Sequence, residues 1–241
     1  IKEQDIDSYK AAADFLNLNN TDVVCLQHEF GIFGGDAGGY ILALLRQLKM
    51  PIITTLHTVL QNPSARQRRV MDELLALSDY VVVMTQKAVD ILQAVNKTHE
   101  SKIRLVPHGI PDVSFIDPNF YKDQYGVEGK TALLTFGLLA PHKGIEIVLR
   151  ALPKVIKEYP NAVYIVVGAT HPSLLRHEGE AYRIFLQRLC DDLKISRNVI
   201  FHNRFVSSEE LKELLVLADI YITPYLQEAQ VVSGTLAYSF G

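Results

Sequence analysis

Residues 132–159 read ALLTFGLLAPHKGIEIVLRALPKVIKEY, and this stretch decides the fold. Residues 132–136 are apolar or β-branched and predict a buried strand. Apolar side chains recur at intervals of three and four residues over 144–159, which predicts an amphipathic helix. The turn between them contains Gly137, Lys143 and Gly144. A strand, a glycine-containing turn and a helix form the repeating unit of a parallel α/β sheet.

The same alternation extends through the rest of the chain in both directions. Further strands are predicted at 21–27, 51–56, 80–84, 103–106, 163–167, 199–201 and 220–223. Further helices are predicted at 7–18, 39–49, 65–78, 86–94, 180–193 and 208–218. We therefore predict an α/β protein of two Rossmann-like β/α/β domains, whose parallel strands are apolar on both faces and covered by helices on both sides.

The alternation is interrupted once, over 109–129, where prolines and aromatic residues replace any clear strand. Such a change in composition is typical of a crossover between domains. We expect an amino-terminal domain over 1–112, a linker over 113–129 and a carboxyl-terminal domain over 130–241. Both domains are expected to be incomplete, because no strand precedes the first helix and the chain closes after a helix-like segment.

Composition excludes several classes of protein. The 241 residues carry a formal net charge of −3, which disfavours a nucleic-acid partner. Cys25 and Cys190 are the two cysteines, each in an apolar stretch, and we expect buried free thiols in a cytoplasmic protein. No stretch approaches the roughly 20 apolar residues that span a bilayer, although peripheral membrane contact stays open.

Polar and glycine residues follow three predicted strands of the first half. Ligands of open α/β sheets bind beyond the carboxyl ends of the strands, so these residues are candidates for ligand contact. They are His28, Glu29, Gly34, Gly35, His57 and His108. Each histidine has a purely structural alternative, and their spacing does not indicate a zinc site.

The second half places a cation and glycines after its first strand. Lys143 with the amides at a helix start would form a cradle for a pyrophosphate group. The turn has neither the Walker order nor a G-x-G-x-x-G pattern, which disfavours a nicotinamide dinucleotide. After the last strand, Glu228 is a candidate acidic residue, and Ser233, Gly234 and Thr235 could offer hydroxyls and amides.

Taken in order, these motifs resemble glycosyltransferase family 4, the retaining group of GT-B enzymes. The motifs are His-Glu-Phe-Gly at 28–31 with Gly-Gly at 34–35, Thr-Leu-His-Thr at 55–58, Val-Pro-His-Gly at 106–109, Phe-Gly-Leu-Leu-x-x-x-Lys-Gly at 136–144, and Ala-Asp-Ile-Tyr-Ile-Thr-Pro-Tyr at 218–225 followed by Glu228. Each motif is weak alone, but the ordered set is specific and covers nearly the whole chain.

The resemblance implies a role for each candidate residue. His57, Lys143 and Glu228 match the residues that contact the reacting sugar and diphosphate. Donor binding falls on Gly137, Leu138, Lys143, Phe205, Val206, Glu228, Ser233, Gly234 and Thr235. His28, Glu29, Gly34, Gly35 and His108 lie on the acceptor side, and no metal ligand is implied.

Two positions depart from the family pattern. The family usually has an arginine where this chain has Leu138, and a second glutamate where it has Leu236. Both replacements remove a polar group that would hold the diphosphate or the ribose.

The resemblance therefore implies transfer of a hexose from a nucleoside diphosphate sugar to a glycan or glycolipid hydroxyl, with retention of configuration and no cofactor. This activity would belong to polysaccharide biosynthesis. A non-catalytic nucleotide- or sugar-binding GT-B module, or an inactive fragment, is the alternative. Another GT-B activity, such as a sugar phosphorylase or nucleotide-sugar epimerase, also stays open.

Overall fold

The computed structural model describes residues 1–113, 116–226 and 232–240. Its contacts divide the chain into two compact units: unit 1 contains Ile1–His108, and unit 2 begins at Gly109. Both units are α/β, as predicted, and each has a four-stranded parallel sheet. No helix among these residues is both long and apolar enough to cross a membrane.

Unit 1 has the strand order β1-β2-β3-β4. The strands are β1 (Val24–His28), β2 (Ile52–Leu56), β3 (Tyr80–Val83) and β4 (Ile103–Leu105), and the helices are α1 (Ile6–Leu18), η1 (Asp36–Gly38), α2 (Ile41–Leu45), α3 (Ala65–Leu77), α4 (Gln86–Val95) and η2 (Glu100–Lys102). Side-chain caps fix two helix starts: Ser64 and Gln67 form a capping box at α3, and Thr85 caps α4. The helix predicted at 39–49 is shorter than expected.

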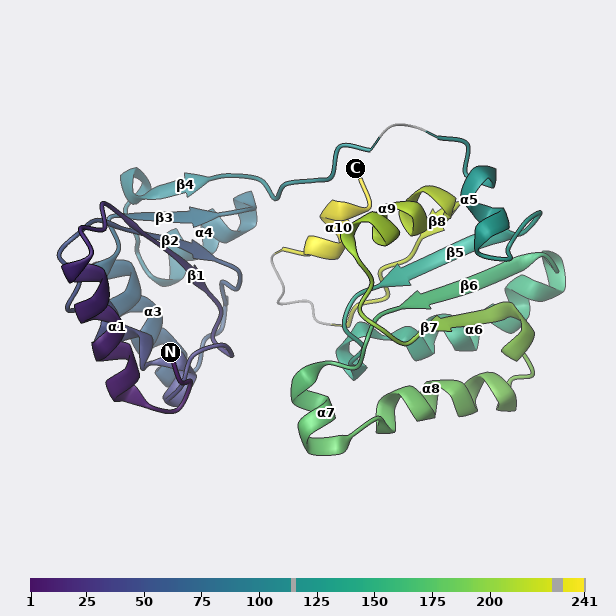
Figure 1. The fold of residues 1–241 in the computed structure, drawn as a ribbon, viewed down its shortest axis with the longest axis horizontal. Coiled ribbons are helices and arrows are strands. Elements are labelled where there is room, and N and C mark those ends of the chain that lie inside the picture. The colour runs from purple at the N-terminus through teal and green to yellow at the C-terminus, as the bar shows by residue number, and fades with distance from the viewer. Residues whose placement is uncertain (114–115, 227–231, 241) are drawn as a thin grey trace. The chain divides into compact units, whose positions relative to one another are not determined.

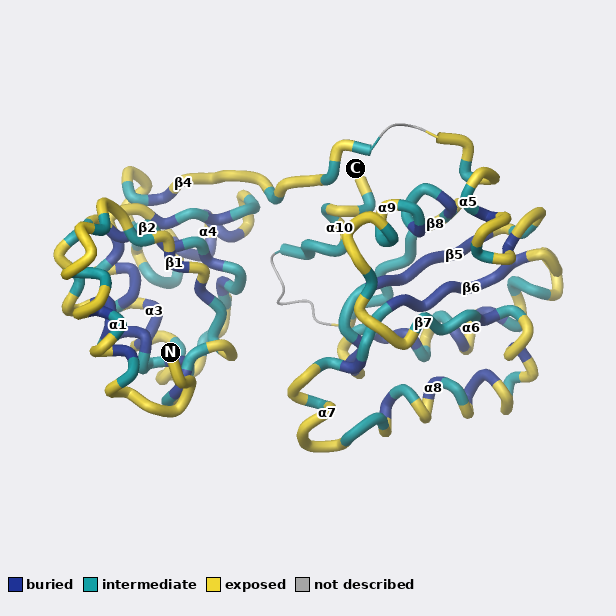
Figure 2. The backbone as a smooth tube through the Cα atoms, in the orientation of Figure 1, coloured by how far each residue is buried: buried dark blue, intermediate teal, exposed yellow. Residues whose placement is uncertain are grey.

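The sheet of unit 1 is packed mainly on one face. Along β1, Leu26 and His28 are buried, whereas Cys25 and Gln27, which alternate with them, are exposed (Figure 2). Apolar residues of the four strands and of α1 to α4 form a single cluster on the buried face. The predicted burial of both strand faces is therefore wrong for β1. The predicted burial of Cys25 is wrong for the same reason, since its side chain alternates onto the open face.

Unit 2 has the strand order β7-β6-β5-β8. The strands are β5 (Thr131–Phe136), β6 (Ala162–Val167), β7 (Val199–His202) and β8 (Ile220–Tyr221), and the helices are α5 (Asn119–Gln124), η3 (Pro141–Lys143), α6 (Ile145–Glu158), α7 (Pro172–Glu178), α8 (Ala181–Asp192), η4 (Ser196–Asn198), α9 (Ser208–Leu217) and α10 (Gly234–Tyr238). Every residue of β6 is buried, as predicted for a central parallel strand.

Helices cover both faces of the unit 2 sheet (Figure 1). Leu133 and Tyr164 pack with α6 and α8, whereas Leu134 and Ile165 pack on the opposite face with α9. Alternate residues of one strand thus enter two separate cores. This packing fixes the register of β5 and β6, because a shift of one residue would exchange the two faces.

Helix α5 lies within the stretch that composition indicated as a linker, and a partly buried ion pair fastens it to the sheet. The Lys122 ammonium donates to both carboxylate oxygens of Asp219, at 2.9 and 2.7 Å, and to the carbonyl oxygen of Lys130 at 3.0 Å. Asp219 also accepts from the amide of Ala132 at 2.7 Å, at the start of β5. These bonds satisfy a lysine that is only 5% exposed.

Candidate functional site

The carboxyl end of β5 continues into a loop that lies against the loop after β6. The amide of Leu139 donates to Ala169 at 2.9 Å, and the amide of His171 donates back to Leu139 at 3.0 Å. Gly168 has a φ of +147°, and a Cβ there would collide with the carbonyl oxygen of Gly137. The glycine therefore permits the two loops to approach closely at the edge where open α/β sheets bind ligands.

Lys143 ends the short helix η3, and a single residue, Gly144, separates it from the start of α6 at Ile145. Gly144 joins the two helices with a φ of +64°, and a Cβ there would collide with the carbonyl oxygen of Pro224. The amide of Leu226 donates to the carbonyl oxygen of His142 at 2.9 Å. The segment after β8 is therefore packed directly against the turn that carries Lys143.

The Lys143 ammonium lies over an aromatic ring. Its Nζ is 4.0 Å from the centroid of Tyr225. The Tyr225 hydroxyl is hydrogen-bonded to Oγ1 of Thr235 at 2.6 Å and lies 3.5 Å from the carbonyl oxygen of Phe136. A Cβ at Gly137 would approach the Thr235 methyl group to 3.3 Å. Sequence-predicted donor residues Gly137, Lys143 and Thr235 thus come together in unit 2.

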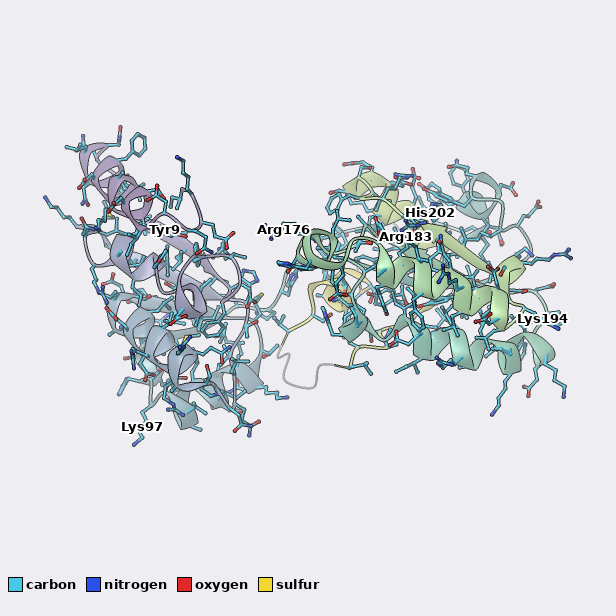
Figure 3. The ribbon with its side chains drawn as sticks, turned by 90° about the horizontal axis from the view of Figure 1, so that it is seen from below. Tyr9, Lys97, Arg176, Arg183, Lys194 and His202 are labelled. Carbon is cyan, nitrogen blue, oxygen red and sulfur yellow. The ribbon has the colours of Figure 1, made fainter. Side chains whose placement is uncertain are left out.

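Lys143 is the cation of this turn, and its neighbour His142 is biased toward the neutral form. Burial lowers the pKa of His142, and the charges of Lys143 and His171 lower it further. Arg176 is an exposed cation of α7, the helix that follows the β6 loop (Figure 3). Lys143, just before the start of the 14-residue helix α6, which has no side-chain cap, is chemically suited to an anion.

The loop after β7 carries the predicted nucleobase-side residues Phe205 and Val206. Phe205 is 83% exposed, whereas Val206 packs partly against the core shared with α9. His202 is the last residue of β7 (Figure 3), and the centroid of its ring is 6.1 Å from that of Tyr125. Burial, followed by the nearby Arg204 charge, lowers the pKa of His202. The imidazole is therefore biased toward its neutral form.

In unit 1, His57 follows β2 and lies beside the end of β1. Its Nε2 is 2.7 Å from Oε1 of Gln27, and its amide donates to the carbonyl oxygen of His28 at 3.0 Å. Glu29 accepts from the Thr58 hydroxyl at 2.6 Å and from the amide of Phe30 at 2.9 Å. The structure therefore brings His28, Glu29 and His57 together at one edge of this sheet.

His28 has an unusual environment for a polar side chain. It is 0% exposed, and its ring lies 5.1 Å from Phe30 and 6.1 Å from Phe33. Neither ring nitrogen has a hydrogen-bond partner among the residues that the structure describes. Burial, followed by the charge of His57, lowers its pKa to about 4. His28 is therefore neutral near pH 7.

The remaining acceptor-side candidates are Gly34, Gly35 and His108. A Cβ at Gly34 would collide with the carbonyl oxygen of Glu3, and one at Gly35 would come within 2.5 Å of the Tyr40 ring. These two glycines therefore have a packing requirement of their own. His108 is partly buried at the end of unit 1.

Two family models together account for most of the chain. The model described as "Glycosyltransferase Family 4" matches residues 5–113, and the model described as "Glycosyl transferases group 1" matches residues 118–230. The chain belongs to the GT-B glycosyltransferases of family 4. The prediction from the ordered motifs is confirmed.

Curated relatives agree with this family. An uncharacterized glycosyltransferase of Methanocaldococcus jannaschii is 24% identical over 195 residues, which are 75% of this chain and 47% of the relative. The GDP-mannose-dependent alpha-(1-6)-phosphatidylinositol monomannoside mannosyltransferase of Mycolicibacterium smegmatis is 28% identical over 103 residues, or 43% of this chain and 24% of the relative. The glycosyltransferase chain thus spans less than half of each of these relatives.

Solved structures show the same fold. Sucrose-phosphate synthase from Thermosynechococcus elongatus aligns with a TM-score of 0.70 at 18% identity, covering 92% of this chain and 55% of that one. HepE from Anabaena in complex with UDP aligns with a TM-score of 0.68 at 15% identity, covering 90% of this chain and 56% of that one. The likeness establishes the two Rossmann-like halves and no more.

The other predicted donor residues lie elsewhere in the sequence around this site. Glu228 lies outside the described residues. Leu138 is partly buried after β5, and Leu236 is 38% exposed on α10. Ser233 directly precedes Gly234, the first residue of α10. Within the described ranges, no three side chains of the metal-ligating types come together.

Sequence reasoning missed two residues of this site: Tyr225 lies at Lys143, and His171 lies beside the same turn, near His142. Tyr225 stood in the quoted motif as a strand-end residue, and His171 follows the β6 loop. The one available signal was position, since both follow strands of the same sheet.

Proposed function

We propose that the protein transfers a hexose from a nucleoside diphosphate sugar to a hydroxyl of a glycan or lipid-linked acceptor, with retention of anomeric configuration. The observation that carries the proposal is the placement of Lys143. Lys143 follows β5 at the carboxyl edge of the unit 2 sheet, just before α6, and its ammonium lies over the ring of Tyr225. Family membership supplies the reaction class, and this cation supplies a place for the donor diphosphate.

The proposed chemistry is electrostatic. Negative charge develops on the diphosphate as the bond to the sugar breaks, and Lys143 with the positive end of α6 would stabilise that charge. No resident cofactor is proposed, because the nucleotide enters as part of the substrate. For His57 and Glu228 we propose contacts with the transferred sugar, as the family resemblance implies.

The relatives support a nucleoside diphosphate sugar without fixing the base. The mycobacterial relative is named for GDP-mannose, whereas HepE was solved with UDP and with UDP-glucose. The two cysteines are free thiols, which fits a reducing compartment, and we propose the cytoplasm. We propose no nucleic-acid partner.

Calorimetric titration of this chain with UDP, GDP and ADP tests the donor site. We expect one diphosphate to bind and Lys143→Ala to weaken it by about 10-fold or more, since hydrogen bonds to charged groups contribute roughly 1.5–3 kcal/mol. Lys154→Ala is the matched control: it removes the same charge from an exposed position on α6. Equal affinity of wild type and Lys143→Ala would contradict the donor site.

A second candidate is a nucleotide- or sugar-binding module without transfer. Leu138 and Leu236 favour it, because the family carries polar groups there. Transfer is measured by mixing nucleoside diphosphate hexoses that carry the tightest-binding base with candidate glycan acceptors, and by following release of the nucleoside diphosphate. Binding that Lys143→Ala abolishes, with no release under any of these conditions, would favour the module over the enzyme.

A further inference from the structure

Tyr225 is built into the Lys143 site more firmly than an incidental neighbour would be. The chain on its amino-terminal side packs on Gly144 through the carbonyl oxygen of Pro224. The chain on its carboxyl-terminal side bonds to the same turn, because the amide of Leu226 donates to His142 at 2.9 Å. The backbone on both sides of Tyr225 is thus fixed against the segment that carries Lys143.

The hydroxyl of Tyr225 fixes its ring in turn. It is hydrogen-bonded to Thr235 Oγ1 at 2.6 Å, from the first turn of α10, and lies 3.5 Å from the carbonyl oxygen of Phe136 at the end of β5. Backbone and hydroxyl together leave the ring little freedom. The end of β5, the Lys143 turn and the start of α10 therefore determine where its face points.

The Lys143 ammonium lies over the face of the Tyr225 ring, 4.0 Å from the ring centroid. This lies well within the roughly 6 Å over which a cation is attracted to an aromatic face. Lysine has a flexible four-carbon side chain, so an unsupported ammonium would sample many positions. The ring restricts it to one.

We propose that Tyr225 is a positioning residue that holds Lys143 ready for the diphosphate of the donor, and this inference rests on the proposed function. The ring limits the entropy that Lys143 loses when the diphosphate binds. Tyr225 therefore contributes only to the affinity for the phosphate groups of a ligand. Ligands that share the nucleoside but lack the diphosphate do not benefit from Tyr225.

The test combines ring and lysine variants in a double-mutant cycle. Wild type, Tyr225→Leu, Tyr225→Phe, Lys143→Ala and Tyr225→Leu/Lys143→Ala are titrated with UDP, GDP and ADP and with the matching free nucleosides. We expect Tyr225→Leu to weaken diphosphate binding about 5-fold, the scale of a cation–π contact, and to leave nucleoside binding unchanged. Tyr225→Phe keeps the ring and should retain most of the affinity.

The cycle separates the two possible failures. In the Lys143→Ala background, Tyr225→Leu should cause no further loss, because its effect passes through the lysine. If Lys143→Ala binds as wild type does, the proposed donor site is wrong. If Lys143→Ala loses binding but Tyr225→Leu retains wild-type affinity, only the role of Tyr225 is overturned. An equal loss from Tyr225→Leu in both backgrounds also overturns it.

A second measurement needs no Tyr225→Leu protein, so it remains valid if that variant folds poorly. It observes the contact between Lys143 and Tyr225 directly. The ring current of Tyr225 should shift the NMR signal of the Lys143 ε-methylene upfield in wild type and in Tyr225→Phe. Saturating diphosphate should leave most of that shift in place, because the ammonium already lies where it meets the phosphates. An ε-methylene signal at the position of an exposed lysine, such as Lys154, would overturn the proposal.

Discussion

Acidification should destabilise unit 1 through His28. This histidine is 0% exposed, and its pKa falls from 6.5 to about 4 because burial disfavours the charged ring. The unfolded chain takes up a proton near pH 6.5, whereas the folded chain does so only near pH 4. Between these values the unfolded state binds more protons, so the free energy of unfolding falls as the pH falls.

The size of the effect follows from the same two pKa values. At 1.36 kcal/mol per pKa unit, His28 should remove about 3 kcal/mol of stability between pH 6.5 and pH 4. That is a large part of the roughly 5–15 kcal/mol that stabilises an ordinary domain. Above pH 6.5 the contribution is constant, because the ring is neutral in both states.

Urea unfolding followed by far-ultraviolet circular dichroism, from pH 7.5 to pH 4.5, measures this dependence. His28→Leu removes the titrating ring while keeping an apolar side chain against Phe30 and Phe33. The variant should lose less stability on acidification than wild type, by about 2–3 kcal/mol across the range. His177→Leu, at an exposed position on α7, serves as the control and should follow wild type. Identical pH slopes for His28→Leu and wild type would refute the reasoning.

The remaining predictions concern unit 2. Lys122→Ala should cost about 1.5–3 kcal/mol in urea unfolding, because it removes the charged donor shared by Asp219 and the carbonyl oxygen of Lys130, and a loss below about 0.5 kcal/mol would contradict this role of the ion pair. Gly144→Ala should lower the melting temperature further than Gly126→Ala and should also weaken diphosphate binding. Both glycines have positive φ, +64° and +67°, but a Cβ collides with the carbonyl oxygen of Pro224 only at Gly144. Equal effects of the two substitutions on melting temperature and on binding would contradict the close approach of Pro224 to Gly144.

The architecture of unit 2 could be predicted because two independent sequence signals agree there. Residues 162–167 form an apolar, β-branched run, and the structure buries every one of them in β6. The helix predicted over 144–159 is α6, and its apolar stripe packs on the sheet. Helix α5 was missed because its pattern is short and lies among prolines. An ion pair with Asp219, far along the chain, fastens it, and local periodicity carries no information about such a contact.

Unit 1 shows a different limit of prediction. Strand β1 has the apolar composition of a doubly covered strand, yet only alternate residues are buried. Apolar composition indicates which faces of a strand could be covered by helices. The placement of the helices decides which of those faces are covered. The exposure of Cys25 follows from that placement, so it could not be derived from its neighbours in sequence.

The candidate site also contains residues that the sequence could predict and a contact that it could not. Gly137, Lys143 and Thr235 were predicted from strand-end position and resemblance, and the structure brings them together around Tyr225. The aromatic ring was present in a quoted motif but had no assigned role, because the contact with Lys143 joins two strand-end loops. Such contacts depend on the order of strands in the sheet, which the motif does not contain.

Binding and transfer should therefore be separable in this protein. Lys143, Tyr225 and Thr235, with the Gly144 turn, all belong to unit 2, so the diphosphate site depends on contacts within one compact unit. The proposed sugar contact of His57 belongs to unit 1. A change at Lys143 should act on diphosphate affinity, whereas His57→Ala should leave that affinity unchanged and lower only the rate of transfer. A His57→Ala variant that loses diphosphate binding would show that the donor site extends beyond unit 2, and the role proposed for the Tyr225 ring would then account for only part of it.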